Sequence, residues 1–498
     1  MFLPAMTTFF LKKFDKWLFI PEICDTMFLT RLTVILVLFL FISPTITDLL
    51  RAQSAKPLSL PGAVQKGLQN YQSILAKRNY INASVALVKN TRNEYLPNVT
   101  GSIQQNYGTI NGQLGPLAPT GIAGPSSAGP SYYSQSWNAA FGASYVINTN
   151  WEFFTFGRLA TKIKLSETQV RTDSADLAQE EFIQSIKISS AYLNLLAAQR
   201  LSLNAEANLN RTSFVQQVVL ARTKSGLNAG VDSSIANAQV SAARLTLIAA
   251  RDYAQQLNNE LAQLINEDPL TVFVLDSSFL SAIPSQLNST VDLSQNPQIR
   301  FYQARIDQSN VSESYLRKSV LPGLNLFGIY QARASGFDYN YTPEFPDRFT
   351  KNYIDGINPK RSNYVAGLAL AWNIFSIAKI KEQVNAQKFI TKAYQDEYDL
   401  VSSQLKAQGV LADQRIINSL QSFKEVPVQY KAASDAYLQK TVLYKNGLTN
   451  IVDVQQALFA LNKAETDVSI AYINVWQALL LKSASTGDFE LFLNQAGK

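Results

Sequence analysis

The residue types that most often carry out chemistry in proteins are scarce in this chain. It contains no histidine, and Cys24 is its only cysteine. Histidine is the commonest general base and metal ligand, so the sequence shows neither a nucleophile–base pair nor a metal cluster. Carboxylates occur in pairs at Glu180-Glu181, Glu267-Asp268 and Asp396-Glu397. Neighbouring residues on a helix point apart, so we interpret these pairs as solvated helix faces. We expect no catalytic residue, no metal, no cofactor and no enzyme activity.

The charge balance argues against a nucleic-acid-binding protein. The 498 residues include 44 Lys and Arg against 37 Asp and Glu, a net charge of +7, and the basic residues form no dense stripe. Hydrophobic residues make up 47% of the chain, which excludes disorder throughout and indicates a folded core.

Two short segments carry a repeated pattern of special residues. The order G-L-x-x-x-V-D occurs in Gly226-Leu227-Asn228-Ala229-Gly230-Val231-Asp232 and in Gly447-Leu448-Thr449-Asn450-Ile451-Val452-Asp453. Turn chemistry explains the glycines, which end an incoming helix, and the aspartates, which we expect to cap the outgoing one. It does not explain Leu227 and Leu448, which are apolar at turns that should face solvent. Such a residue repeated at two tips indicates a docking surface.

Aromatic residues occupy a second pair of related positions. They are Trp151, Phe153, Phe154, Trp372 and Phe375. Each group lies where a strand-like run gives way to a helical one. Either the rings form an aromatic girdle at a membrane interface, or they pack so as to anchor each strand to its helix.

These motifs belong to an internal repeat. The blocks Trp151–Phe154 and Trp372–Phe375 are separated by the same number of residues as the two tips. Upstream, Leu96-Pro97 matches Leu321-Pro322 at an offset only slightly larger. Several blocks at one offset are hard to obtain by chance, so we infer two structural repeats.

Each half has the same expected order of elements. A helix ends at the Leu-Pro break, because proline stops it, and strand-like runs rich in Tyr, Val, Ile, Phe and Gly follow. The expected helices are 71–94 and 299–318, and the expected strands are 98–108, 136–151, 323–333 and 364–375. The strands are long enough to cross a membrane when tilted, which takes about 9–11 residues.

Long helical segments follow each tryptophan block. Proline and glycine are absent from 158–225 and from 232–266. The second half repeats this at 377–446, except for Gly409 and Pro427, and at 453–485 without exception. We expect Gly409 and Pro427 to interrupt the third of these helices. The apolar residues of the last one, from Val454 to Leu479, follow coiled-coil spacing with Glu465 as the one polar exception. Antiparallel helix pairs should therefore turn at the two tips.

The N-terminal residues have the order of a secretory signal. Arg31 precedes the apolar run 34–42, and small residues follow at Ala52, Ser54 and Ala55. Translation could start at Met27 rather than at Met1. Cys24 lies before the apolar run, so we expect no lipid anchor. That run is shorter than the roughly 20 apolar residues of a membrane-spanning helix, so we expect strands to cross the membrane.

The expected organisation has four parts. Residues 1–55 are a leader and signal peptide, 56–290 the first repeat, 291–487 the second repeat, and 488–498 a C-terminal tail. The fold class is α+β.

The tips, tryptophan blocks, Leu-Pro breaks and two-fold order together resemble the TolC-like outer membrane efflux protein family, over nearly all of residues 60–487. The resemblance implies a homotrimer whose chains each give four strands to a shared transmembrane β-barrel. A long α-helical coiled-coil barrel would continue from it into the periplasm. It further implies docking to a periplasmic adaptor (a membrane fusion protein), which works with an inner-membrane RND or ABC transporter. The adaptor-docking residues carried over are Gly226, Leu227, Asn228, Val231, Asp232, Gly447, Leu448, Thr449, Val452 and Asp453.

The same resemblance implies a periplasmic gate at the second tip. In TolC an arginine and two inward aspartates hold this entrance closed. Here Asp453 matches the first aspartate, whereas the second falls on Gln456 and the arginine on Thr449. We therefore expect a gate with fewer ionic contacts and a weaker cation-binding constriction.

Two other classes of protein fit parts of the sequence. A secreted coiled-coil scaffold or adhesin would have linkers in place of the strands and would stay soluble. A carboxylate hydrolase of the outer membrane would need a catalytic constellation that cannot be drawn without histidine or cysteine.

Overall fold

The computed structural model describes residues 57–111, 133–285 and 293–496. The predicted signal peptide and Cys24 lie outside this part of the chain, as do most of the first expected loop and part of the linker between the halves.

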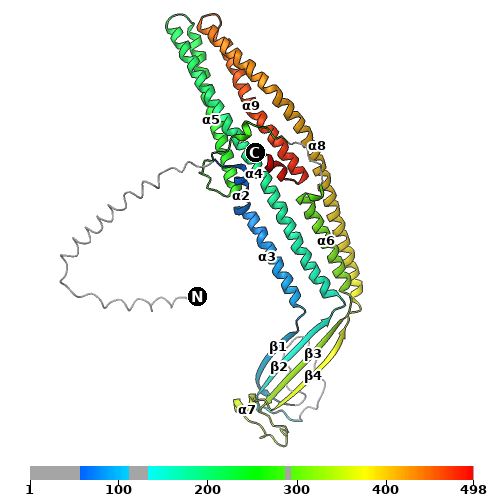
Figure 1. Ribbon diagram of the computed structural model, residues 1–498. Helices are drawn as coiled ribbons and strands as arrows, with labels where there is room; N and C mark the ends of the chain where they lie inside the picture. The colour runs from blue at the N-terminus through cyan, green and yellow to red at the C-terminus, as the bar shows by residue number, and fades with distance from the viewer. Residues whose placement is uncertain (1–56, 112–132, 286–292, 497–498) are drawn as a thin grey trace, which may run out of the picture. The chain divides into compact units, whose positions relative to one another are not determined.

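One order of elements occurs twice along the described chain (Figure 1). In the first half it is α3 (Gln72–Asn93), β1 (Asn98–Thr109), β2 (Ala139–Phe154), α4 (Arg158–Lys224) and α5 (Gly230–Ile265). In the second half it is α6 (Pro297–Lys318), β3 (Gly323–Ser335), β4 (Arg361–Ala371), α8 (Ser376–Lys445) and α9 (Ile451–Thr486). All ten elements lie where the sequence predicts them, within a few residues at most ends. The chain is thus mainly helical with a small antiparallel sheet.

Shorter elements join this frame. They are α2 (Leu60–Asn70), α7 (Tyr353–Ile357) and α10 (Glu490–Ala496), with single turns of 3₁₀ helix at Ser278–Leu280 and Leu293–Gln295. No sequence pattern described above predicts these short elements. Among the described helices, none is both long and apolar enough to cross a bilayer.

The four strands form one antiparallel sheet in the order β1-β2-β3-β4, so β2 and β3 join the two halves. Side chains alternate between the faces of a sheet, and the pairing register therefore sorts them. One face carries Ile103, Tyr145, Ile147, Leu326, Tyr330, Tyr364, Leu368 and Leu370. The other carries Thr100, Ser102, Gln104, Asn106, Ser144, Asn148, Gln331 and Asn363. The first face is mainly apolar, whereas the second holds most of the polar side chains together with Val146, Phe327, Ile329 and Val365.

The helices next to the sheet lie side by side in the order α3, α4, α6, α8. Farther from the sheet α5 returns along α4 and α9 along α8, so each half ends in a helical hairpin (Figure 1). The two hairpins also touch each other through α4 and α9.

Helix α8 is continuous, contrary to the interruptions expected at Gly409 and Pro427. It contains 70 residues with Pro427 inside it. Pro427 is exposed, so the backbone carbonyl that loses its intrahelical bond there lies at a solvated surface. Gly409 faces α9, where an added Cβ would lie 3.6 Å from Ser485 Oγ. Packing along the rest of the helix outweighs two locally unfavourable residues.

The main hydrophobic core lies where α2, α4, α5, α9 and α10 meet. Tyr192, Phe279, Trp476 and Phe492 form a chain of edge-to-face rings there, with centroids 4.9 to 6.1 Å apart. Tyr192 Oη donates to the carbonyl of Leu58 at 2.7 Å, and burial raises the pKa of this phenol to about 12. The C-terminal segment therefore contributes to the core through α10.

Each tryptophan block ties its strand to the preceding helix. Trp151 Nε1 donates to the carbonyl of Tyr95 at 2.7 Å, and Trp372 Nε1 donates to the carbonyl of Val320 at 2.9 Å. Both carbonyls lie two residues before the proline of a Leu-Pro break. These equivalent bonds support the anchoring interpretation for the two tryptophans. Phe375, by contrast, is 91% exposed.

Removing one of these indole donors should lower stability. We expect Trp151→Phe to cost about 1 kcal/mol of unfolding free energy, because it removes one hydrogen bond and keeps the aromatic packing. Thermal unfolding followed by circular dichroism measures the effect. The control is Trp137→Phe at a side chain that is 83% exposed. Equal midpoints for the two variants would contradict the anchoring role.

Candidate docking and gating site

Both hairpin tips have the same backbone geometry. Gly226 and Gly447 adopt φ of 72° and 76°, the left-handed region that glycine enters without a Cβ clash. In each turn the glycine amide donates to the carbonyl three residues back, and the following leucine amide donates to the carbonyl five residues back, at 2.9 to 3.0 Å. This pair of bonds is the Schellman motif. The predicted helix ends at Gly226 and Gly447 are confirmed.

The aspartates do not cap the outgoing helices, contrary to expectation. The N-cap residues are Ala229, which has no side-chain bond, and Asn450, which accepts from the amide of Asp453 at 2.9 Å. Both helices begin two residues earlier than predicted, so Asp232 and Asp453 are the third residues of α5 and α9. They still lie in the first turn, where the helix dipole favours negative charge.

Each tip aspartate is held by the polar side chain four residues before it. Asn228 Nδ2 donates to Asp232 Oδ2 at 2.8 Å, and Thr449 Oγ1 donates to Asp453 Oδ2 at 2.6 Å. In the second tip Lys440 Nζ adds an ion pair to Asp453 at 2.9 Å. The Thr449 hydroxyl and the Lys440 ammonium lower the pKa of the Asp453 carboxyl. Gln456, one turn along α9, is exposed.

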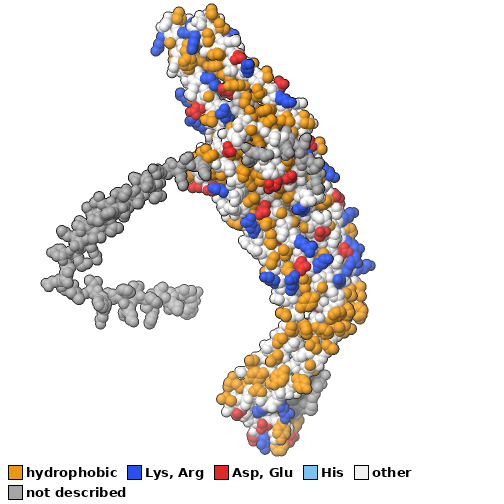
Figure 2. Space-filling model, in the orientation of Figure 1, with side chains coloured by type: hydrophobic (Ala, Val, Ile, Leu, Met, Phe, Trp, Pro, Cys, Tyr) orange, Lys and Arg blue, Asp and Glu red, His pale blue; other side chains and the backbone are white. Residues whose placement is uncertain are grey.

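The apolar residues of both tips face solvent, as the sequence predicts. Leu227 is 68% exposed and Leu448 is 72% exposed, and Val231 and Val452 beside them are also exposed. Figure 2 shows hydrophobic side chains next to Lys and Arg at this end of the hairpins. Side chains exposed to this extent bury little apolar surface within the single chain.

Arg222 joins the two tips, and it is not among the site residues predicted from the sequence. Its Nε donates to Asn228 Oδ1 at 2.9 Å. Its Nη1 donates to the carbonyls of Tyr444 and Lys445 at 3.3 and 3.0 Å, at the C-terminal end of α8. The guanidinium also lies over the Tyr444 ring, 5.4 Å from its centroid. A basic residue in the last turn of α4 is the only sequence signal, and nothing local indicates that its acceptors belong to the other repeat.

Tyr444 completes this contact between the tips. Its hydroxyl accepts from Asn228 Nδ2 at 2.9 Å, and the residue is only 4% exposed. Burial raises the pKa of the phenol, so Tyr444 stays a neutral hydrogen-bonding group. Arg222, Asn228 and Tyr444 thus form one cluster, which we call the tip latch.

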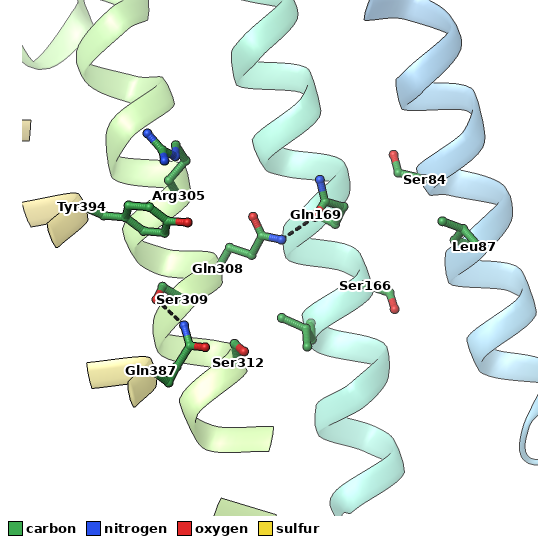
Figure 3. Close-up of a pocket in the computed structure, with 11 residues that line it drawn as sticks. Ser84, Leu87, Ser166, Gln169, Arg305, Gln308, Ser309, Ser312, Gln387 and Tyr394 are labelled. Atoms are coloured by element: carbon green, nitrogen blue, oxygen red, sulfur yellow. Dashed lines mark hydrogen bonds between the residues drawn. The ribbon is translucent and has the colours of Figure 1, made fainter. Parts of the chain in front are cut away.

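A polar pocket of about 390 Å³ lies among α3, α4, α6 and α8 (Figure 3). Gln308 of α6 donates to Gln169 of α4, and Gln387 of α8 donates to Ser309 of α6 at 2.7 Å. At its edge the Arg305 guanidinium is paired with Glu397, which compensates its charge. The pocket therefore offers mainly neutral hydrogen-bonding groups that connect neighbouring helices.

One carboxylate of each acidic pair that we interpreted as a solvated helix face forms an ion pair with a basic residue of another element. Glu397 pairs with Arg305, Glu181 with Arg78, and Glu267 with Lys66. The carboxylates are partly exposed, so such pairs contribute little stability individually. They connect neighbouring elements, which the interpretation as solvated faces does not predict.

A four-stranded sheet joined to two long helical hairpins is the architecture of the described chain, and the comparisons with known proteins find this fold again. Residues 63–267 match the model of the outer membrane efflux protein family. No curated protein matches the sequence.

Several solved structures share the fold. The outer-membrane channel OprN is 17% identical with a TM-score of 0.66, covering 87% of this chain and 90% of its own. The CmeC outer membrane channel of Campylobacter jejuni is 16% identical with a TM-score of 0.68, covering 86% and 85%. CusC is 12% identical with a TM-score of 0.69, covering 87% and 92%. At these identities the likeness shows a shared fold, and the match to the outer membrane efflux protein family model is confined to residues 63–267.

Proposed function

We propose that three copies of this chain form an outer-membrane channel-tunnel that passively conducts substrate from the periplasm to the exterior. The observation that carries the proposal is the sheet, which has two open edges, one mainly apolar face and one face that holds most of its polar side chains. The solved structures of the same fold support the proposal, because they are outer-membrane channels. The match to the outer membrane efflux protein family model supports it as well.

The open edges favour closure by further copies. Backbone groups at a sheet edge inside a bilayer have no water to bond, so a membrane sheet must close into a barrel. Four antiparallel strands place β1 and β4 at the edges running in opposite directions, so β4 of one copy can pair antiparallel with β1 of the next. The apolar face then meets lipid and the polar face lines the pore.

Cysteine cross-linking across this edge tests the proposal. Gln104→Cys on β1 and Asn363→Cys on β4, in a Cys24→Ser background, place two thiols on the polar face at opposite edges of the sheet. We expect oxidation in outer-membrane fractions to yield covalent dimers and trimers. Further cysteine pairs at neighbouring positions of the polar face then show which residues of β1 and β4 lie opposite each other between copies. The single Gln104→Cys variant should yield no trimer. Monomers throughout the screen, or a soluble protein, would favour the scaffold alternative.

The tips are the proposed docking site for a periplasmic adaptor. Two exposed leucines on equivalent turns would provide the apolar centre of such an interface at each tip. The charged and polar groups around them would form its polar rim. An inner-membrane RND or ABC transporter linked to that adaptor would supply the energy. The predicted signal peptide would direct the chain to the envelope.

The periplasmic gate is proposed at Asp453 and Gln456. Three copies of Asp453 around a three-fold axis would form an anionic ring, and Gln456 would add no charge to it. Lys440 lies 2.9 Å from the Asp453 carboxylate and compensates part of its charge. We therefore propose a weak cation-binding constriction.

Asp453→Asn should abolish block of the current by multivalent cations. Because the pKa of Asp453 is lowered, the carboxylate is ionised from neutral pH down through the ordinary aspartate range, near about 3.9. Cation block in the unmodified channel should therefore not change between about pH 8 and about pH 5, and should weaken only in stronger acid. Planar-bilayer recording measures both effects. Unchanged block in Asp453→Asn would remove Asp453 from the gate.

A further inference from the structure

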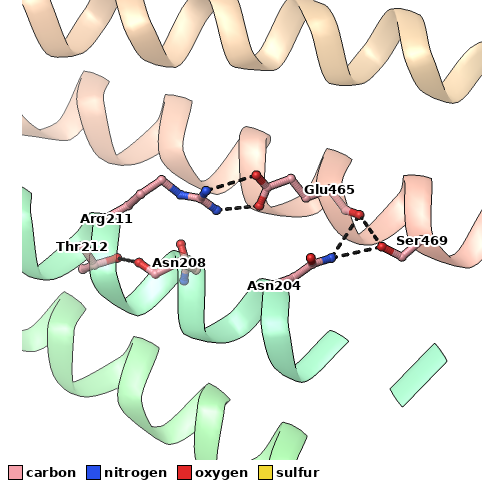
Figure 4. Close-up of polar contacts among 6 residues, drawn as sticks. All are labelled: Asn204, Asn208, Arg211, Thr212, Glu465 and Ser469. Carbon is pink, nitrogen blue, oxygen red and sulfur yellow. Dashed lines mark hydrogen bonds and ion pairs between the residues drawn. The ribbon is translucent and has the colours of Figure 1, made fainter. Parts of the chain in front are cut away.

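A polar layer crosses the contact between the two hairpins (Figure 4). Arg211 of α4 forms two parallel bonds with Glu465 of α9, at 3.1 and 2.5 Å. Two turns before Arg211 on α4, Asn204 Nδ2 donates to the Glu465 backbone carbonyl and to Ser469 Oγ, both at 3.2 Å. Asn204 and Ser469 are buried, and Arg211 and Glu465 are mostly buried.

The layer separates two hydrophobic clusters. The main core includes residues of α4 up to Ala198 and of α9 from Ile473 onward. A smaller tip core includes Val215 and Val219 of α4, Ala236 of α5, Tyr444 of α8, and Ile451 and Val454 of α9. Neither cluster takes a residue of α4 between Ala198 and Val215. Glu465 is also the one polar exception in the coiled-coil pattern of α9.

We propose that Arg211, Glu465, Asn204 and Ser469 form a register pin between the two hairpins. The pin keeps α4 and α9 in a single alignment while the tip core beyond it opens and re-forms. The inference deepens the proposed function and rests on it, because a gate at the tips requires the hairpins to part there and return.

The physical basis of the pin is that its hydrogen bonds and ion pair fit only one alignment of α4 along α9. Apolar coiled-coil contacts look alike from one turn to the next, so α9 could slide along α4 by one turn, about 5.4 Å, and still bury apolar surface. A bidentate Arg–Glu pair has one matching position. Sliding would leave two mostly buried charges without their partners, which is strongly unfavourable.

The pin is not the most stabilising arrangement for this position. Arg211 Nε is buried and has no hydrogen-bond partner among the described residues. Replacing a buried ion pair by apolar residues is often neutral or stabilising, whereas removing one partner is costly. An apolar replacement should therefore keep the fold and lose the alignment.

Disulfide trapping in the full-length protein, in a Cys24→Ser background, tests the pin. Asn208→Cys on α4 is combined in turn with Leu458→Cys, Asn462→Cys or Thr466→Cys on α9, one turn apart from each other. Asn208, Leu458 and Asn462 line the same groove. Asn204 bonds to Glu465 and Ser469, and four residues farther along α4 correspond to about four residues back along antiparallel α9. The native alignment should therefore favour Asn208 with Asn462. With Arg211→Met and Glu465→Met together, we expect a second pair to cross-link to at least about a third of the Asn462 yield.

Two further variants complete the test. The exposed pair Arg251–Glu206 joins α5 to α4 at 3.4 Å, so Glu206→Gln is the matched control and should leave the pattern unchanged. The swapped pair Arg211→Glu with Glu465→Arg should restore the single pair if direction-dependent pairing sets the register. A single pair in the Met variant, or a swapped variant that behaves like the Met variant, would overturn the pin. Trimer formation on gels is scored separately, so failure of the proposed channel and failure of the pin give different results.

Discussion

Leu227→Asp combined with Leu448→Asp should abolish export while leaving the trimer intact. Both leucines are largely exposed in the single chain, so replacing them removes no core packing. In a docked adaptor interface each would bury an apolar side chain, worth about 1.5–3 kcal/mol. Aspartate forfeits that burial at two tips and adds charge that must be desolvated. A total loss of about 3 kcal/mol or more corresponds to at least about a hundredfold weaker binding.

The effect is measured at two levels. Susceptibility of cells to exported compounds reports transport, and photo-crosslinking from Asn228 and Thr449 with mass spectrometry reports which proteins touch the tips. Leu270→Asp is the control, because Leu270 is 87% exposed in the segment after α5 and far along the chain from either tip. Full export by the double variant, with no protein captured at either tip, would show that the tips are not the docking surface.

Arg222→Ala should open the channel in the absence of a partner. The tip latch joins the two hairpins of one chain through Arg222, and the arginine bonds three acceptors at once. Hydrogen bonds from a charged group contribute about 1.5–3 kcal/mol, so losing this residue removes a large part of the contact between the tips. We expect a larger resting conductance in planar bilayers and greater entry of compounds normally excluded from the cell.

Lys224→Ala provides the matched control for charge. Lys224 is an exposed basic residue in the same last turn of α4. Tyr444→Phe removes only the hydroxyl that accepts from Asn228, so its effect should be smaller and in the same direction. A resting conductance for Arg222→Ala equal to that for Lys224→Ala would mean that the latch does not hold the gate.

The tip latch and the register pin connect the same two hairpins at different distances from the tips. The latch bonds the two turns to each other, whereas the pin holds α4 and α9 on the other side of the tip core. If both proposals hold, Arg222→Ala should raise conductance without changing the cross-linking register. The pin variants should change the register even when the latch is intact.

The sequence alone determined the order and the approximate bounds of the main helices and strands. The prolines after Leu96 and Leu321 end two helices, and Gly226 and Gly447 end two more. Long segments that lack both residue types predict the long helices. These signals depend on the conformation of a few neighbouring residues, which the chain carries wherever it folds. The same local reasoning was wrong at Pro427, where the surrounding helix tolerates an unfavourable residue.

Only the tertiary structure decided which side chains meet across these elements. Trp151 and Trp372 find carbonyls at the helix ends, Arg222 finds the end of α8, and Glu465 finds Arg211. The polar and apolar faces of the sheet likewise depend on strand register. Such contacts join residues far apart in sequence, and their distances are set by how helices and strands pack rather than by local backbone preference. A sequence pattern can mark Glu465 as an exception within a coiled coil, but the packing of α9 on α4 is what places its partner.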